Sequence, residues 1–213
     1  MNRVILSAST DETILAVTRQ HKLVDLEIEQ QINTEIVGCI YKGVVKNIVP
    51  AVDGIFVDIG IGKNAFLRRK DLLNEKRFPT EGSPILAQVI KSDTDMKGAL
   101  ITEKISMFGK YAVTLSGTGY IGVSKKIRQE SVRKRLKEIG KEICAEHMGL
   151  IIRTAAENAD MDEFRKDITR LKENWDIIQK RFRMEKSPTL LYRESDIIVK
   201  ALRDYVNKGT EIL

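Results

Sequence analysis

The sequence contains few of the residues that define several common protein classes. It has only two cysteines among 213 residues, and neither belongs to a Cys-x-x-Cys pair, so neither a zinc knuckle nor a disulfide framework is indicated. No stretch of about 18 apolar residues is present, and the apolar run within the first ten residues is too short for a signal peptide. We therefore expect a soluble cytoplasmic protein in which Cys39 and Cys144 are small buried groups.

The chain also lacks the short motifs of several catalytic sites. There is no Walker-type glycine loop, no Gly-x-Ser-x-Gly elbow and no His-Glu-x-x-His sequence. The acidic pairs Asp93/Asp95 and Asp160/Asp162 lie in a predicted turn and at a predicted helix start, which favours turn and capping roles over metal binding. The two histidines have no obvious partners, so we expect them at the surface or in loops. By themselves, these residues indicate no catalytic group and no metal site.

Positive charge is in modest excess and is unevenly spread. The chain has 36 Lys and Arg residues against 30 Asp and Glu, a net charge of +6, which favours a polyanionic partner but is also common among proteins without one. The strongest positive field is expected over residues 125–141. This stretch is either a solvated helix face or a surface that follows phosphates. Its cations are Lys125, Lys126, Arg128, Arg133, Lys134, Arg135, Lys137 and Lys141.

The first hundred residues carry the pattern of β-strands. Alternating apolar residues and short polar turns predict an antiparallel meander with strands over 4–8, 14–18 and 23–28. From residue 40 onward, glycine and proline divide a second group of short strands, which predicts a small β-barrel. Its expected strands cover residues 44–49, 54–58, 65–67, 84–91 and 97–103.

Two aromatic residues on neighbouring barrel strands, Phe56 and Phe66, are candidates for ligand contacts. If both rings point to the same outer face, they form a stacking platform of the kind by which OB-folds hold single-stranded nucleic acid. The alternative is that both rings fill the barrel core, where phenylalanine is more often found. A positive rim is expected around the platform from Lys42, Lys46, Lys63, Arg68 and Arg69.

From about residue 104 the pattern changes to mixed α and β. Short strands are expected at 111–115, 120–123 and 149–154, with a helix over 131–143. A long amphipathic helix is expected after the acidic cap Asp160, because apolar residues recur every three or four positions as far as Phe182. A last helix is expected over 194–206. The predicted class is α+β: an N-terminal β-meander, an OB-fold β-barrel, and a mixed α/β domain with a long amphipathic helix.

Several segments together resemble the ribonuclease E/G family of bacterial endoribonucleases. The sequences IYKG, GIFVDIG and AFLRRKDLL resemble its ribosomal-type OB-fold RNA-binding domain. The likeness continues in the family's order and at similar spacing through KGALITEKISMFGKYAVTL, GVSKKI, MGLIIRTAAEN, RLKENWDIIQK and SPTLLYRESDIIVKALRDY. The resemblance therefore covers nearly the whole chain.

The resemblance implies an RNA-binding site in the barrel. Phe56 and Phe66 are expected to stack on bases of single-stranded RNA, and Lys97 is expected to neutralise a phosphate. No catalytic residue and no metal ligand is expected in this chain.

The resemblance also implies a pocket for the 5′ monophosphate of the RNA. Arg153 and Thr154 are expected to grip the phosphate, with Gly109 and Val113 on the other side of the pocket. The sequence AAEN after this pair replaces a more glycine-rich version in the family.

A secondary basic patch is expected at Lys125, Lys126 and Arg128. The two lysines stand where the family usually has arginines. Positive charge is therefore kept, while bidentate phosphate recognition is lost.

The resemblance implies four parts of the chain. Residues 1–35 are expected to begin a ribonuclease-H-like subdomain, 36–103 to form the OB-fold, 104–208 to form a 5′-sensor α/β domain, and 209–213 to begin a truncated strand. The magnesium-binding aspartate pair and the zinc-binding cysteines through which the family oligomerises are not found here. We expect an RNA-binding N-terminal half, active in rRNA processing and mRNA decay, that cuts no RNA alone. The alternative is a stand-alone, non-catalytic RNA-binding or ribosome-associated OB-fold module.

Overall fold

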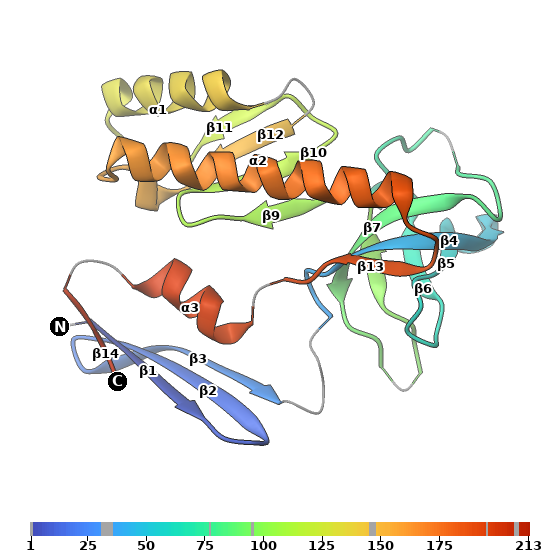
Figure 1. The fold of residues 1–213 in the computed structure, drawn as a ribbon, viewed down its shortest axis with the longest axis horizontal. Helices are drawn as coiled ribbons and strands as arrows, with labels where there is room; N and C mark the ends of the chain where they lie inside the picture. Colours follow the sequence, from blue (N-terminus) through green and yellow to red (C-terminus); the bar gives the residue numbers. More distant parts are fainter. Residues whose placement is uncertain are drawn as a thin grey trace. The chain divides into compact units, whose positions relative to one another are not determined.

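The computed structural model describes residues 2–30, 36–76, 78–94, 96–144, 148–194, 196–206 and 209–213. The chain divides into two compact units, one made of Met1–Ile36 with Glu194–Leu213 and one made of Val37–Arg193. Figure 1 labels the elements of both units.

The first unit is a four-stranded sheet that carries one helix. The expected antiparallel meander is present, and β14 adds to β1 in parallel, giving the order β14-β1-β2-β3. The helix α3 begins after Asp196, whose carboxylate accepts a hydrogen bond from Val199 N at 2.9 Å. The bounds are β1 Asn2–Ala8, β2 Glu12–Arg19, β3 Lys22–Gln30, α3 Ile197–Tyr205 and β14 Thr210–Ile212.

The helix α3 packs on the N-terminal strands. Ile197 and Ala201 are buried against Val4, Leu15 and Val17. The sequence analysis places this helix in the α/β domain 104–208. In the structure it belongs to the first unit, because its apolar face packs on the apolar face of β1 and β2.

The second unit contains the barrel. Its strands are ordered β13-β4-β5-β6-β8-β7, and β7 pairs back onto β4, so five of the strands close a ring while β13 lies outside it. Strand β13 has no counterpart among the sequence expectations. The bounds are β4 Ile40–Val49, β5 Gly54–Asp58, β6 Ala65–Arg68, β7 Pro84–Lys91, β8 Leu100–Thr102 and β13 Thr189–Tyr192.

A second sheet follows the barrel in the same unit, with two helices on one of its faces. Its order is β11-β12-β10-β9, and only the β11/β12 pair is parallel. Leu150 and Ile152 of the sheet share a core with Leu136 of α1 and with Phe164 and Ile168 of α2, as Figure 1 shows for the elements. The bounds are β9 Ser106–Phe108, β10 Ala112–Ser116, β11 Ile121–Val123, α1 Glu130–Ile143, β12 Met148–Ile152 and α2 Met161–Met184.

The long helix α2 begins as the sequence predicts. The carboxylate of Asp160 accepts hydrogen bonds from Asp162 N at 2.8 Å and from Glu163 N at 3.3 Å, so the expected cap is present. Neither α2 nor any other helix in the described ranges is both long and apolar enough to cross a membrane.

Replacing Asp160 with alanine tests the cap. Asp160→Ala leaves two N–H groups of the first turn without their acceptor, and we expect the free energy of unfolding to fall by about 1 kcal/mol. Chemical denaturation measures this change. Asp176→Ala, at an exposed position in the middle of the same helix, is the matched control and should change stability much less. An equal loss in both variants would contradict the capping role.

Candidate RNA-binding surfaces

The two barrel phenylalanines form a pair on the outside of the barrel. Phe56 and Phe66 are direct cross-strand partners on β5 and β6, with ring centroids 5.4 Å apart and an interplanar angle of 51°. Their chain neighbours, such as Ile55 and Leu67, are fully buried, while both rings are partly exposed. Because successive side chains on a strand point to opposite faces, the rings lie outside the barrel core.

A glycine makes room for one of these rings. A Cβ atom on Gly54 would lie 2.3 Å from the outer atoms of the Phe66 ring. The ring therefore leans over the β5 backbone at a point where any larger residue would push it away.

Lys42 is not part of the rim, and that expectation was wrong. Its side chain is 9% exposed, and its Nζ donates hydrogen bonds to Phe182 O at 2.7 Å and Glu185 O at 2.6 Å. The ammonium also lies 5.0 Å from the centroid of the Phe182 ring. The ammonium therefore satisfies carbonyl groups at the end of α2 and is shielded from solvent.

Lys46 and Lys63 are near the surface and have partners. Lys46 pairs with Asp58 at 3.3 Å, and Lys63 Nζ donates to Thr94 O at 2.9 Å. The backbone N–H of Lys97 donates to Thr94 and closes the same turn. The side chain of Lys97 is exposed and makes no ion pair with a described residue. Lys97 is thus a cation available near the start of β6.

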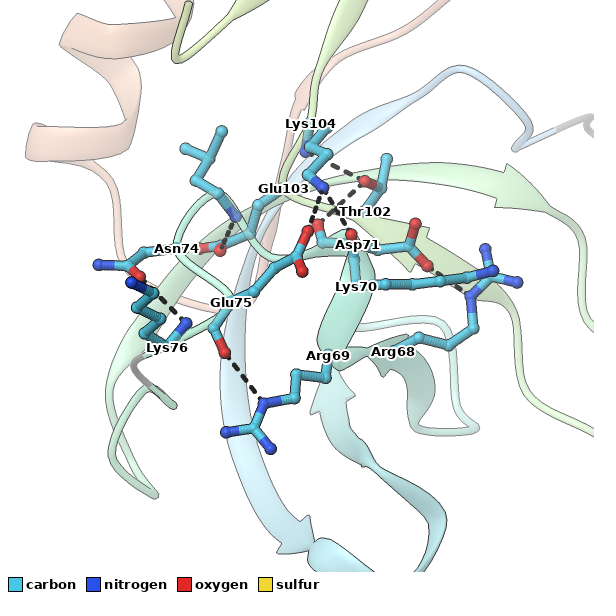
Figure 2. Close-up of polar contacts among 11 residues, drawn as sticks. Arg68, Arg69, Lys70, Asp71, Asn74, Glu75, Lys76, Thr102, Glu103 and Lys104 are labelled. Carbon is cyan, nitrogen blue, oxygen red and sulfur yellow. Dashed lines mark hydrogen bonds and ion pairs between the residues drawn. The ribbon is translucent and has the colours of Figure 1, made fainter.

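The basic segment after β6 is held by acids and carbonyl groups, as Figure 2 shows. Arg68 bonds to Asp71, and Arg69 Nε donates to Glu75 O at 2.9 Å. Lys104 Nζ reaches the carboxylate of Glu75 at 2.9 Å. These contacts fix the arginines and cancel part of their charge.

Glu103 supports the same segment from the barrel end. Its carboxylate accepts a hydrogen bond from Leu73 N at 2.9 Å, and burial raises the pKa of this carboxyl above its usual range.

The second expected site brings two of its members into contact. Arg153 follows β12, and its Nη1 donates to Gly109 O at 2.7 Å, while its backbone N–H bonds to Tyr111 O at 2.8 Å. Thr154 begins a short 3-10 turn, and its Oγ1 lies 3.0 Å from Ser124 Oγ. The guanidinium is therefore fixed on the Gly109 carbonyl, and a second hydroxyl, from Ser124, lies beside Thr154.

Val113 lies on the open face of the second sheet. It pairs with Phe108 on β9 and with Ile151 on β12, and all three are at least partly exposed. The structure places Val113 beside the strand that leads into Arg153, on the face that the helices leave uncovered.

A buried acid supports the turn at Gly109, and sequence reasoning missed it. Asp167 is 7% exposed and accepts hydrogen bonds from Tyr111 N and from Arg170 Nη2, each at 2.8 Å. A Cβ atom on Gly109 would lie 2.4 Å from its carboxylate, so any larger residue would displace that carboxylate from its hydrogen bonds. The available signal was an acid on the apolar face of α2, three residues after Phe164.

Tyr111 is fixed by α2 through a second contact. Its hydroxyl donates to Glu163 at 2.6 Å, and burial together with this hydrogen bond raises the pKa of Tyr111 to about 12.

The remaining expected residues form an exposed turn. Lys125, Lys126 and Arg128 are solvent-exposed around the buried Ile127. Asp93 is exposed, and Asp95 lies outside the described residues. Within the described ranges, no three His, Cys, Asp or Glu side chains are grouped so that they could hold a metal ion.

Comparison with known proteins agrees with this layout. Residues 34–102 match the S1 RNA binding domain, which is the barrel. Residues 106–213 match the ribonuclease E/G family. The chain belongs to the ribonuclease E/G family.

Individual members of the family match most of the chain. Ribonuclease G of Escherichia coli K12 is 33% identical over 221 residues, covering 96% of this chain and 45% of that protein. Ribonuclease G of Haemophilus influenzae is 32% identical, with 98% and 46% covered. Ribonuclease E of Synechocystis is 34% identical, with 84% and 28% covered. The chain thus spans somewhat less than half the length of the ribonuclease G proteins it matches.

Removing the Asp167 carboxylate tests its support of the turn. Asp167→Ala leaves the buried Tyr111 N–H without an acceptor, and we expect a loss of about 1–3 kcal/mol of stability. Denaturant unfolding of this variant and of Glu173→Ala, an exposed position on the same helix, measures the difference. Equal stabilities would show that the carboxylate is dispensable.

Proposed function

We propose that the chain is the RNA-binding region of a ribonuclease E/G-type endoribonuclease that acts in RNA processing and decay. In this proposal the barrel holds single-stranded RNA and the α/β region recognises the RNA's 5′ monophosphate. The observation that carries the proposal is the partly exposed Phe56–Phe66 pair on the outside of an S1-type barrel. We assign no catalytic step to the described residues.

The chemistry of the barrel suits single strands. Unpaired bases expose flat π faces, and stacking on an aromatic side chain contributes about 1 to 3 kcal/mol per base. The two rings offer adjacent surfaces for such stacking, and Lys97 supplies a cation for a phosphate. This combination binds RNA with little dependence on sequence.

The chemistry of the second site suits a terminal phosphate. A guanidinium carries five N–H groups in a planar fork, and the bond from Arg153 to Gly109 O fixes the orientation of that fork. The hydroxyl of Thr154, at the start of the 3-10 turn, and the hydroxyl of Ser124 beside it are additional neutral donors. A phosphate monoester has enough oxygen atoms to accept from all of them.

The first unit fits the same proposal. A parallel β14 beside β1 supports the assignment of residues 1–35 and 209–213 to one ribonuclease-H-like subdomain.

Replacing Phe66 tests the barrel site. Phe66→Ala removes one stacking surface, and we expect the affinity for a single-stranded RNA to fall about tenfold, in line with the stacking contribution. Fluorescence anisotropy with a labelled oligonucleotide measures the affinity.

Two further variants separate binding from folding. Gly54→Ala keeps the ring but displaces it, so it should also weaken binding. Leu67→Ala removes a buried neighbour and should lower stability with a smaller effect on affinity. Unchanged affinity in folded Phe66→Ala would contradict the stacking role.

The phosphate site predicts a preference between two RNA ends. A strand with a 5′ monophosphate should bind more tightly than the same strand with a 5′ hydroxyl, because each charge-assisted hydrogen bond contributes about 1.5–3 kcal/mol before screening. Arg153→Ala should remove the preference and leave the affinity for the hydroxyl strand nearly unchanged.

Binding measurements at low salt give the ratio for each protein. Thr154→Ala is the milder companion variant and should reduce the preference in part. Equal binding of both strands by the unmodified protein would contradict the phosphate site and favour a module that binds RNA through its barrel alone.

A further inference from the structure

Almost all of the chain's net charge lies in one short segment. Residues 125–142 contain eight cations and three acids, while the other 195 residues contain 28 cations and 27 acids. The excess is therefore local, and outside this segment the chain is close to neutral.

The helix α1 arranges part of this charge in a line. Leu136, Ile139 and Gly140 are buried on one side of the helix. Lys134, Lys137 and Lys141 are exposed and recur after three and four residues, so they form one stripe on the opposite side. At 1.5 Å per residue, the stripe is about 10 Å long.

The acids of the segment leave this stripe with a net positive charge. Glu142 pairs with Arg165 of α2 at 3.0 Å, and Glu130 pairs with Arg133 at 3.7 Å. The third acid, Glu138, is exposed beside the stripe and offsets one of its charges at most. Lys134, Lys137 and Lys141 make no ion pair with any described residue.

Arg133 fastens the preceding turn to the helix. Its Nη1 donates to Ser124 O at 2.7 Å and to Ile127 O at 2.9 Å. Ser124 Oγ in turn lies 3.0 Å from Thr154 Oγ1. The exposed cations of this turn therefore extend from the phosphate site toward the stripe on α1.

We propose that the α1 stripe binds the sugar-phosphate backbone of RNA and extends the basic patch expected at the preceding turn, at a surface additional to the barrel and the 5′-phosphate site. The cations of the stripe are Lys134, Lys137 and Lys141, and the expected patch beside it contains Lys125, Lys126 and Arg128. The inference rests on the proposed function, because it takes RNA as the partner. The α1 stripe would contact RNA without regard to its base sequence. Only a strand long enough to extend beyond the barrel would reach it.

The chemistry of the surface favours RNA over a lipid membrane. Helices that lie on membranes bury an apolar face in the lipid. The apolar face of α1 is already used by the protein core. Lysines on the outer face act as point charges that suit phosphates spaced along a backbone.

The test uses the triple variant Lys134→Gln/Lys137→Gln/Lys141→Gln and two RNA strands with 5′ hydroxyl ends. One strand has about 8 nucleotides, which a single OB-fold can hold, and the other has about 30. For the long strand we expect affinity to fall at least about fivefold. The slope of log Kd against log salt should decrease by about 0.7 for each phosphate that the variant no longer neutralises. The short strand should bind as before.

A second triple variant with the same charge change is the control. Lys22→Gln/Lys180→Gln/Lys186→Gln alters exposed lysines elsewhere in the chain and should leave both affinities nearly unchanged. Circular dichroism and Tm establish that both triple variants are folded.

Three results would overturn the proposal. Equal loss of RNA affinity in both triple variants would mean that the overall charge of the protein, and not the α1 stripe, sets the affinity. Equal loss of affinity for both strands would mean that the effect does not depend on RNA length. Unchanged RNA affinity combined with weaker binding to anionic lipid vesicles would identify a membrane surface. In each case the proposed function remains supported if the short strand still binds and Phe66→Ala still weakens that binding. If the unmodified protein binds no RNA, the proposed function and this further inference are both wrong.

Discussion

The buried ammonium of Lys42 is the interaction on which the layout of the larger unit depends. The last carbonyl groups of a helix have no partner within the helix. Lys42 on β4 satisfies Phe182 O at the end of α2 and Glu185 O just beyond it. Arg181 then bonds to Leu190 O at 3.0 Å, and β13 continues along β4. The end of α2 is thereby fixed to the barrel.

The helix α2 connects this fixed end to the other candidate site. Its 24 residues extend over about 36 Å. Its first turns supply Glu163 and Asp167, which hold Tyr111 by its hydroxyl and its backbone N–H. Tyr111 O accepts from Arg153 N. One helix thus fixes the turn around Gly109 at its start and the strand β13 beside β4 at its end.

Three physical groups can be distinguished among the cations of this protein, and net charge alone does not separate them. Lys42 is buried and structural. Arg69, Arg133 and Arg153 are partly exposed and fixed by carbonyl or carboxylate groups, so their orientation costs little entropy on binding. Lys97 and the three stripe lysines of α1 are exposed, make no ion pair with a described residue and keep their charge for a polyanion, unlike the paired Lys46 and Lys104.

The sequence by itself determined the features that depend on near neighbours. Helical periodicity and the Asp160 cap located α2, and alternation located the barrel strands, because both signals act within a few residues. Only barrel closure through β4 and β7 decided that Phe56 and Phe66 lie outside the core. Only the tertiary structure placed Lys42 inside, because its partner Phe182 is 140 residues away and no local pattern encodes that interaction.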